Sequence, residues 1–239
     1  MSGFLLKLLA AITMLIDHAG LLLFPGARWM RVVGRIAFPL YAYFIAEGFR
    51  YTHDRKRYFL QIFLLGAACQ IVYTIADGTL YLGILITFSF SILLLALLRE
   101  MHAAWQGDGT TVGQWLADHG FATAARRSLT TTAFFGTTVL LALLTTVVRV
   151  DYGFCGMLVP LAAYLPDKPA HRKLAFAGML TVLSAYQWML GDHVQVWCLV
   201  AMLPLCLYNG KPGKHRLKWF FYIFYPAHMA ILYLLSLVF

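Results

Sequence analysis

The feature that most constrains this chain is a series of long apolar runs separated by short polar segments. A helix needs about 20 mostly apolar residues to cross a bilayer. Nine stretches meet or approach this length: residues 5–24, 34–51, 58–76, 80–98, 131–150, 154–166, 174–190, 193–209 and 218–238. The sixth and seventh fit least well, and the sixth is short enough to be broken or re-entrant. The sequence therefore predicts an all-α polytopic transmembrane helix bundle.

Composition supports this fold class. Charged residues make up 12% of the 239 residues, whereas soluble domains carry about 25%. We find no repeat or low-complexity tract, so residues 1–239 are predicted to form one integral membrane domain. The one long connection, 99–130, is expected on the cytoplasmic side. It begins as a flexible turn, and Val112–Ala125 is predicted to form a short helix in the membrane interface.

The nineteen Lys and Arg residues outnumber the ten Asp and Glu residues, which gives a net charge of +9. In a soluble protein this excess would suggest a nucleic-acid partner. Here basic residues gather in alternate connections between the apolar runs, which is the pattern that orients membrane helices. The residues in the last of these connections are Lys211, Lys214, Arg216 and Lys218. We therefore predict a cytoplasmic N-terminus, an external C-terminus, contact with membrane lipids and no nucleic-acid partner.

Four basic residues do not follow the charge pattern, and several ionisable groups lie inside the apolar runs. The exceptions are Arg28, Arg31, Arg35 and Arg149, and the ionisable groups inside the runs include Asp17, His18, Glu47 and His228. Ionisable groups inside a membrane are costly and often functional. A single intramembrane histidine can equally be a packed residue that is hydrogen-bonded to a neighbouring helix. An adjacent Asp-His pair together with a second histidine favours function.

The geometry of the first helix suggests how these groups are used. Neighbouring residues on a helix diverge by about 100°, so Asp17 cannot orient His18 directly. We expect Asp17 to pair with an arginine from another segment, first of all Arg35. Lys7 and His18 lie eleven residues apart, on nearly the same helix face and about 16 Å apart along the axis. This spacing suits a long ligand with an anionic head and a reactive tail, although Lys7 alone also fits a plain topology anchor.

Four short segments give the chain a family resemblance. They are Asp17-His18, Gly34-Arg35-Ile36-Ala37-Phe38-Pro39-Leu40-Tyr41-Ala42, Asp151-Tyr152-Gly153-Phe154-Cys155-Gly156 and Phe224-Tyr225-Pro226-Ala227-His228. In this order and spacing they resemble the TraX family, membrane proteins associated with N-terminal acetylation of conjugative pilin. The interval from Lys7 to His18 is also similar to the Arg-x10-His pattern of membrane acyltransferase-3 proteins, with Lys in place of Arg.

The resemblance implies an acetyl-CoA-dependent acyltransferase in the bacterial inner membrane. Members of the wider group take the donor from the cytoplasm and modify an acceptor on the opposite side. The implied acceptor is the N-terminal amine of a pilin, with a glycan or a lipid headgroup as alternatives. Acetyl-CoA is expected as a co-substrate, and no metal is expected. The four cysteines show no metal-ligand spacing: Cys69, Cys155, Cys198 and Cys206.

Acyl transfer needs a base, a site for the thioester oxyanion and anchoring of the donor. His18 is the expected base or transient acyl carrier, and His228 or Tyr225 is expected to polarise the thioester carbonyl. The expected catalytic residues are His18, Asp17, Arg35, His228 and Tyr225. The residues expected to hold CoA are Lys7, Arg55, Lys56 and Arg57. The residues expected to bind the substrate are Asp151, Tyr152 and Glu47.

Alternatives stay open at this point. Arg35 fits a purely structural partner of Asp17 nearly as well, and the basic run at 55–57 is most often only a topology signal. Intramembrane Asp, Glu and His also build proton relays, so a proton-coupled transporter is a rival, although we find no internal repeat of the kind many transporters show. A pilus assembly factor without catalytic activity is the third possibility.

Overall fold

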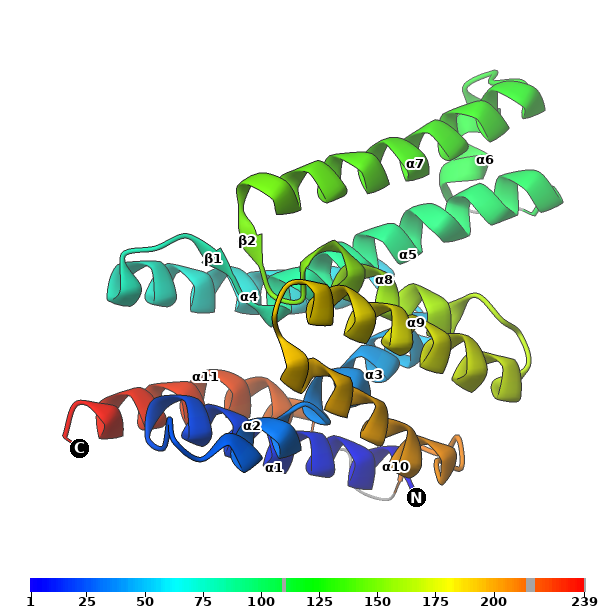
Figure 1. Cartoon of the computed structure of the whole chain (residues 1–239). Coiled ribbons are helices and arrows are strands. Elements are labelled where there is room, and N and C mark those ends of the chain that lie inside the picture. The colour runs from blue at the N-terminus through cyan, green and yellow to red at the C-terminus, as the bar shows by residue number, and fades with distance from the viewer. Residues whose placement is uncertain (109–110, 214–217, 239) are drawn as a thin grey trace. The chain divides into compact units, whose positions relative to one another are not determined.

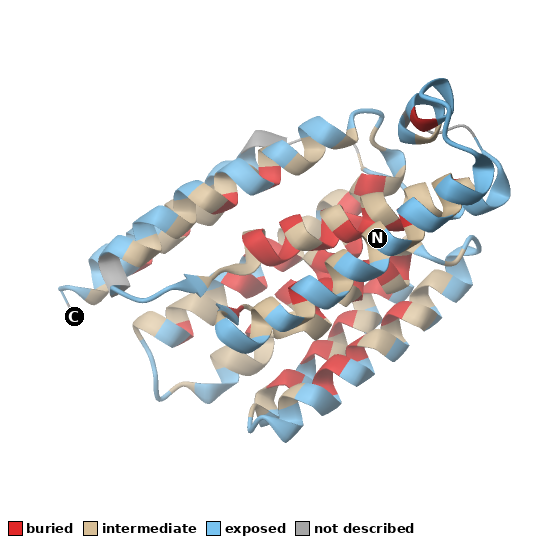
Figure 2. Cartoon of the chain, turned by 90° about the horizontal axis from the view of Figure 1, so that it is seen from above, coloured by how far each residue is buried: buried red, intermediate tan, exposed pale blue. Residues whose placement is uncertain are grey.

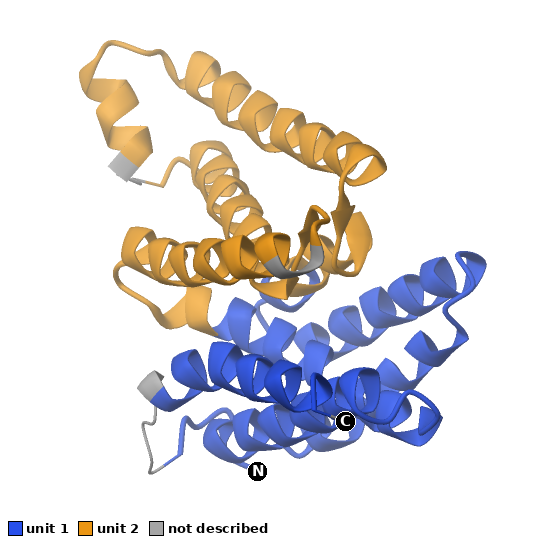
Figure 3. Cartoon of the chain, turned by 90° about the vertical axis from the view of Figure 1, so that its left-hand side faces the viewer, with its two compact units in different colours: residues 1–47, 162–239 blue, residues 48–161 orange. Residues whose placement is uncertain are grey.

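The computed structural model describes residues 1–108, 111–213 and 218–238, and these are mostly helical (Figure 1). The chain forms two compact units (Figure 3). Unit 1 comprises residues 1–47 and 162–239, and unit 2 comprises residues 48–161. The chain passes from one unit to the other within helices α3 (Ala37–Tyr51) and α8 (Gly153–Tyr164). That the two units act as the single domain 1–239 stays a prediction.

Unit 1 begins with a tight helical hairpin of α1 (Gly3–Leu22) and α2 (Arg28–Gly34). Ser2 caps α1 by accepting a hydrogen bond from the backbone N–H of Leu5, which satisfies one of the free donors at the helix start. Two glycines allow α1 and α2 to approach closely. A Cβ atom on Gly20 would lie 2.7 Å from Cβ of Met30, and one on Gly34 would lie 2.1 Å from Oδ1 of Asp17.

The remaining elements of unit 1 are α9 (Pro169–Met189), the 3-10 helix η1 (His193–Ala201), α10 (Met202–Cys206) and α11 (Lys218–Ser236). Helix α11 packs against α1, and η1 packs against α9 and α2. The buried residues of η1 are Gln195, Cys198 and Ala201. They are spaced by three because a 3-10 helix has three residues per turn, so every third residue lies on the same face.

Unit 2 contains α4 (Arg55–Asp77), α5 (Ile84–Gln106), α6 (Thr111–Asp118), α7 (Thr123–Val147) and most of α8. Helix α5 contacts α4, α6 and α7. Two short strands, β1 (Tyr81–Leu82) and β2 (Arg149–Val150), form a parallel pair. In the core, the Ser91 hydroxyl donates a hydrogen bond of 2.9 Å to the carbonyl oxygen of Met157, which joins α5 to α8.

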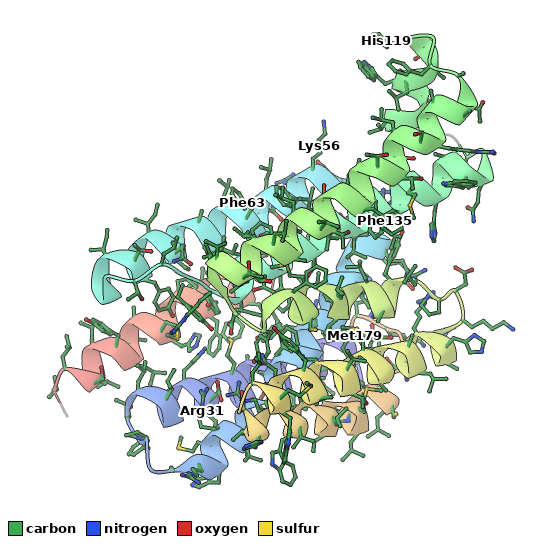
Figure 4. All side chains as sticks on the ribbon, turned by 45° about the horizontal axis from the view of Figure 1, so that its top comes forward. Arg31, Lys56, Phe63, His119, Phe135 and Met179 are labelled. Atoms are coloured by element: carbon green, nitrogen blue, oxygen red, sulfur yellow. The ribbon has the colours of Figure 1, made fainter. Side chains whose placement is uncertain are left out.

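Both units expose apolar side chains on the outer faces of their helices. Figure 2 shows the buried residues as stripes on helices whose other faces are exposed. On α4 and α7 the exposed residues include Ile75 (80% exposed) and Val147 (85% exposed). Phe135 also points outward from α7 (Figure 4). Apolar faces this extensive are unusual on soluble proteins and are typical of helices surrounded by lipid.

The predicted number of membrane spans is not confirmed. Each of the nine predicted stretches contains helix, but among the described residues five helical segments are long and apolar enough to cross a membrane. They are Gly3–Leu22, Arg28–Tyr51, Arg55–Ile75, Ile84–Gln106 and Thr123–Val147. Helix α8 has 12 residues and is about 18 Å long, short of the bilayer's hydrocarbon core of about 30 Å. The all-α membrane fold is confirmed, and the count of about nine spans is not.

Two local predictions also need correction. The predicted helix 34–51 is interrupted at Arg35–Ile36, and Pro39 lies in the first turn of α3, where a missing backbone N–H costs nothing. The connection 99–130 is shorter than predicted, because α5 continues to Gln106 and α7 begins at Thr123. A short helix does lie between them, but it ends at Asp118 and does not continue to Ala125.

Candidate active site

The centre of the candidate site is a pair of histidines from the first and last described helices. His18 lies on α1 and His228 on α11. Nδ1 of His18 lies 2.8 Å from Nε2 of His228, and the two rings stack with centroids 5.0 Å apart. His228 is only 4% exposed. Two residues separated by 210 positions in the sequence are therefore in hydrogen-bond contact inside unit 1.

The His228 ring is held on several sides by its own helix. Its Nδ1 donates a hydrogen bond of 2.7 Å to the carbonyl oxygen of Phe224, one turn earlier. The Phe224 ring stacks on the imidazole with a centroid distance of 4.8 Å, and the Tyr225 ring meets its edge at 5.8 Å. Tyr225, which was expected to polarise the thioester, therefore packs beside His228.

Asp17, next to His18 in the sequence, is held by Arg31. Nη1 of Arg31 lies 2.7 Å from Oδ2 of Asp17 and also donates to the Asp17 backbone carbonyl. The partner expected from the sequence was Arg35, and the structure corrects this. The α1–α2 hairpin places Arg31, one helical turn before Arg35, opposite Asp17. Figure 4 labels Arg31 on this hairpin.

Arg35 instead forms an ion pair with Asp192 at the start of η1, with a distance of 3.9 Å. Asp192 also caps η1 by accepting a hydrogen bond of 3.1 Å from the backbone N–H of Val194. The guanidinium groups of Arg31 and Arg35 both lie near enough to His18 to interact with it electrostatically. We call these residues the His18 cluster: Asp17, His18, Arg31, Arg35, Asp192 and His228.

Sequence reasoning gave no site role to Arg31 and Asp192, and it did not single out Gln195. Arg31 and Arg35 lie four residues apart, so their shared helix face was an available signal. Gln195 is fully buried, and neither atom of its amide makes a conventional hydrogen bond among the described residues. Its position depends on the 3-10 geometry of η1, which nothing in the apolar pattern of 193–209 distinguishes from an α-helix.

Two predicted site residues lie at the opposite end of α1. Nζ of Lys7 lies 4.9 Å from the centre of the Phe44 ring. Glu47, within electrostatic range of Lys7, forms an ion pair of 3.8 Å with Arg172 and accepts a hydrogen bond of 3.2 Å from the Tyr208 hydroxyl. Glu47 thus connects three segments of unit 1 at the Lys7 end, away from the His18 cluster.

The segment Asp151–Gly156 lies in unit 2 and forms the turn into α8. Oδ1 of Asp151 accepts a hydrogen bond of 2.8 Å from the Tyr81 hydroxyl, and its backbone carbonyl accepts one of 3.0 Å from Thr87. Tyr152 has a φ of 59°, a left-handed conformation that is uncommon for non-glycine residues. A Cβ on Gly156 would lie 2.4 Å from Cβ of Tyr152. The glycine therefore permits this turn, and substrate contact by Asp151 and Tyr152 stays a prediction.

The basic run expected to bind CoA begins α4 in unit 2. The Arg55 guanidinium lies 5.3 Å from the centre of the Phe49 ring. The backbone N–H of Arg57 donates to the capping residue Asp54, and the side chains of Lys56 and Arg57 are exposed. Figure 4 shows Lys56 pointing away from α4. CoA binding here stays a prediction. Lys214 and Arg216, expected to help orient the helices, lie outside the described residues.

Metal binding stays equally untested. Within residues 1–108, 111–213 and 218–238, no group of three or more His, Cys, Asp or Glu side chains is arranged to hold a metal ion.

Long apolar helices that carry a partly buried histidine pair and two ion pairs indicate an α-helical membrane protein with a cluster of polar groups among its helices. A family model described as "TraX protein" matches residues 2–236. The chain therefore belongs to the TraX family, and the resemblance expected from its sequence motifs is confirmed. Similarity to the acyltransferase-3 group stays a prediction.

The chain is similar to three described relatives. It is 26% identical to the "Probable fimbrial assembly protein FimC, serogroup H1" of Dichelobacter nodosus, covering 97% of this chain and 94% of the relative. It is 26% identical to "Protein TraX" of Escherichia coli, covering 98% of this chain and 86% of the relative. An uncharacterized protein, RP591, of Rickettsia prowazekii (strain Madrid E) is 42% identical over 30% of this chain and 27% of its own length. No solved structure matches the chain. The family is thus linked by name to fimbrial assembly.

Proposed function

We propose that this protein is an integral membrane acetyltransferase. It takes acetyl-CoA from the cytoplasmic side and transfers the acetyl group to an acceptor amine at the outer side of the membrane. The observation that carries the proposal is the hydrogen-bonded pair of half-buried His18 and buried His228, which lies near two arginines. A histidine held in a defined orientation by a second group is the arrangement that general-base catalysis requires.

The names of the relatives support a pilus-related acceptor. One relative is described as a fimbrial assembly protein, and the sequence motifs resemble those of proteins associated with pilin acetylation. We therefore propose the N-terminal amine of a pilin subunit as the acceptor.

The proposed reaction balances as follows. The neutral amine of the acceptor attacks the carbonyl carbon of the thioester, a C–N bond forms, and the C–S bond then breaks. His18 takes the proton that the amine loses and gives it to the departing thiolate. The products are an N-acetylated acceptor and CoA with a free thiol. In the alternative route, His18 itself attacks the thioester and carries the acetyl group to the amine.

The arginines suit the charge that develops during this reaction. The carbonyl oxygen of the thioester becomes negative when the amine attacks, and a preorganised positive group stabilises it. Arg35 is 12% exposed at its side chain and lies near His18. Because the contact of Arg31 with Asp17, at 2.7 Å, is much shorter than the 3.9 Å between Arg35 and Asp192, we assign positioning of the α1–α2 hairpin to Arg31 and oxyanion stabilisation to Arg35.

Lys7 is the proposed anchor for the donor. It lies on nearly the same face of α1 as His18, about 16 Å along the helix. Its ammonium lies over the Phe44 ring, which fixes the cation by a cation–π contact. A CoA molecule whose phosphates bind Lys7 at one end of α1 can extend its thioester along the helix toward His18.

The test uses purified protein in lipid vesicles with labelled acetyl-CoA and a short synthetic peptide that has a free N-terminal amine. Wild-type protein should label this peptide and should not label the same peptide with a blocked N-terminus. His18→Ala should abolish transfer, whereas His171→Ala, at an exposed histidine on α9, should leave it unchanged. If folded His18→Ala protein retains wild-type transfer, His18 is not the base or the acyl carrier.

Two further measurements separate the alternatives. Label retained on the protein without acceptor would indicate the acyl-histidine route. Acetyl-CoA should also raise the melting temperature of an acetyltransferase, because a ligand that binds only the folded state stabilises it. A proton-coupled transporter or a non-catalytic assembly factor should show no such shift.

A further inference from the structure

We infer that His228 is a positioning residue that fixes the proton of His18 on Nδ1, so that His18 reacts through Nε2. The hydrogen bonds of the two rings carry this inference. Its consequence for catalysis rests on the proposed function.

The first step concerns His228. Its Nδ1 lies 2.7 Å from the carbonyl oxygen of Phe224. A carbonyl oxygen only accepts hydrogen bonds, so Nδ1 of His228 carries a proton. Stacking on Phe224 and the edge contact with Tyr225 hold the ring in the orientation that makes this bond.

The second step concerns the contact between the rings. A neutral imidazole with its proton on Nδ1 has a lone pair on Nε2. Nε2 of His228 lies 2.8 Å from Nδ1 of His18, so it accepts a hydrogen bond from that nitrogen. His18 then carries its proton on Nδ1, and its Nε2 keeps the lone pair that a base or nucleophile needs.

A doubly protonated His228 would reverse this contact, but its surroundings disfavour it. It would place a positive charge in a site that is 4% exposed, and a buried charge is costly unless it is paired. The carboxylates of the His18 cluster already bind arginines, Asp17 to Arg31 and Asp192 to Arg35. The neutral form of His228 satisfies both of its ring nitrogens without an added charge.

The arrangement assigns different tasks to the two histidines. When Nε2 of His18 takes a proton from the acceptor, its Nδ1–H becomes part of a cation, and hydrogen bonds from charged donors are stronger than neutral ones. His228 therefore stabilises the protonated state of His18 as it forms. Since both nitrogens of His228 are engaged, polarisation of the thioester carbonyl is left to Arg35.

NMR of the full-length protein tests the tautomer without relying on activity. The protein is labelled with 15N-histidine and placed in lipid nanodiscs, and the His18 signals are assigned by their loss in His18→Gln. The expected result is a neutral His18 with its proton on Nδ1. A His18 protonated on Nε2 in the wild-type protein would overturn the inference.

Two substitutions at His228 test the consequence. His228→Leu removes the acceptor, so the His18 proton should move to Nε2 and kcat should fall about 100-fold or more, with an unchanged KM for acetyl-CoA. His228→Gln places an amide oxygen near the position of Nε2, and we expect it to restore part of the lost kcat. A folded His228→Leu protein with wild-type kcat would show that His228 does not act through His18.

Failure of the proposed function is distinguishable from failure of the inference. If the wild-type tautomer is as expected but no acetyl transfer occurs, the acetyltransferase proposal fails and the proton assignment stands. If transfer occurs and the proton lies on Nε2, the assignment fails and the proposal stands. Should His228→Leu not fold, the wild-type spectrum still decides the tautomer.

Discussion

The two units differ in how they accommodate polar groups in an apolar interior. In unit 2 the buried polar side chains among the described residues are all hydroxyls: Thr87, Ser89, Ser91 and Thr130. Each donates to a backbone carbonyl, mostly one turn earlier on its own helix. In unit 1 the buried set includes His228 and Gln195, and the half-buried ion pairs of the His18 cluster lie around them.

The difference matters because the two kinds of polar group depend on different parts of the chain. A hydroxyl that bonds its own helix is satisfied wherever that helix lies. A buried carboxylate or imidazole needs a particular partner from another segment, and loses more when that partner is removed. Unit 1 should therefore be sensitive to single substitutions, and unit 2 should tolerate them.

The largest expected effect comes from the ion pair beside His18. Arg31→Met leaves the Asp17 carboxylate without its partner and should lower the free energy of unfolding by about 3 kcal/mol. Thermal unfolding of the purified protein measures this. The double variant Asp17→Leu with Arg31→Met removes both charges and should recover most of the stability. If Arg31→Met alone is as stable as wild type, the contrast between the units does not hold.

The next effect concerns the close approach of α1 and α2. A methyl group at Gly34 would lie 2.1 Å from Oδ1 of Asp17, so Gly34→Ala should force the hairpin apart at a cost of about 2 kcal/mol. Acetyl transfer should fall with it, because Asp17 precedes His18. The matched control is Gly178→Ala on α9, where a Cβ meets nothing within 4 Å. Equal stability of the two variants would contradict the packing at Gly34.

A smaller effect should reveal which unit anchors the donor. Lys7→Met in unit 1 should raise the KM for acetyl-CoA about tenfold with little change in kcat. A tenfold change corresponds to about 1.4 kcal/mol of binding free energy. Lys56→Met, at an exposed residue of unit 2, is the paired substitution. Steady-state kinetics of both variants sharpen the comparison. If Lys56→Met raises the KM for acetyl-CoA more than Lys7→Met does, α4 and not α1 anchors the donor.

The smallest effect is expected in the core of unit 2. Ser91→Ala loses the hydrogen bond to the Met157 carbonyl and should cost about 1 kcal/mol. Its kcat should equal that of the wild type, because unit 2 carries no residue of the His18 cluster. A loss of activity greater than the loss of folded protein would mean that the packing of α5 on α8 contributes to catalysis.

Much of the fold could be predicted from the sequence, because long apolar runs in a membrane protein form helices. The interruption at Arg35–Ile36 and the 3-10 geometry of η1 could not be predicted. Both depend on tertiary contacts, such as the ion pair of Arg35 with Asp192, and the apolar pattern is the same for an α-helix and a 3-10 helix. The count of about nine spans is not confirmed, because apolar runs such as 154–166 are also found in short helices.

Part of the candidate site was predictable as individual residues, but Arg31, Asp192 and the pairing of the side chains were not. His18, Asp17 and His228 could each be identified because an ionisable group inside a membrane is energetically costly and therefore rare in an apolar run. Nothing local to either helix specifies that α1 packs against α11. The choice of Arg31 over Arg35 depends on how the turn at residues 23–27 sets the register of the hairpin, and one helical turn of register changes the partner.

The pairing of α1 with α11 has a consequence for biosynthesis. His18 leaves the ribosome before its partner His228, which follows 210 residues later. Until the last described helix has inserted beside the first, the imidazole of His18 has no acceptor for its Nδ1 proton. A chain in which α11 has not inserted beside α1 therefore carries His18 without its histidine partner. Insertion of α11 is the step that assembles the histidine pair.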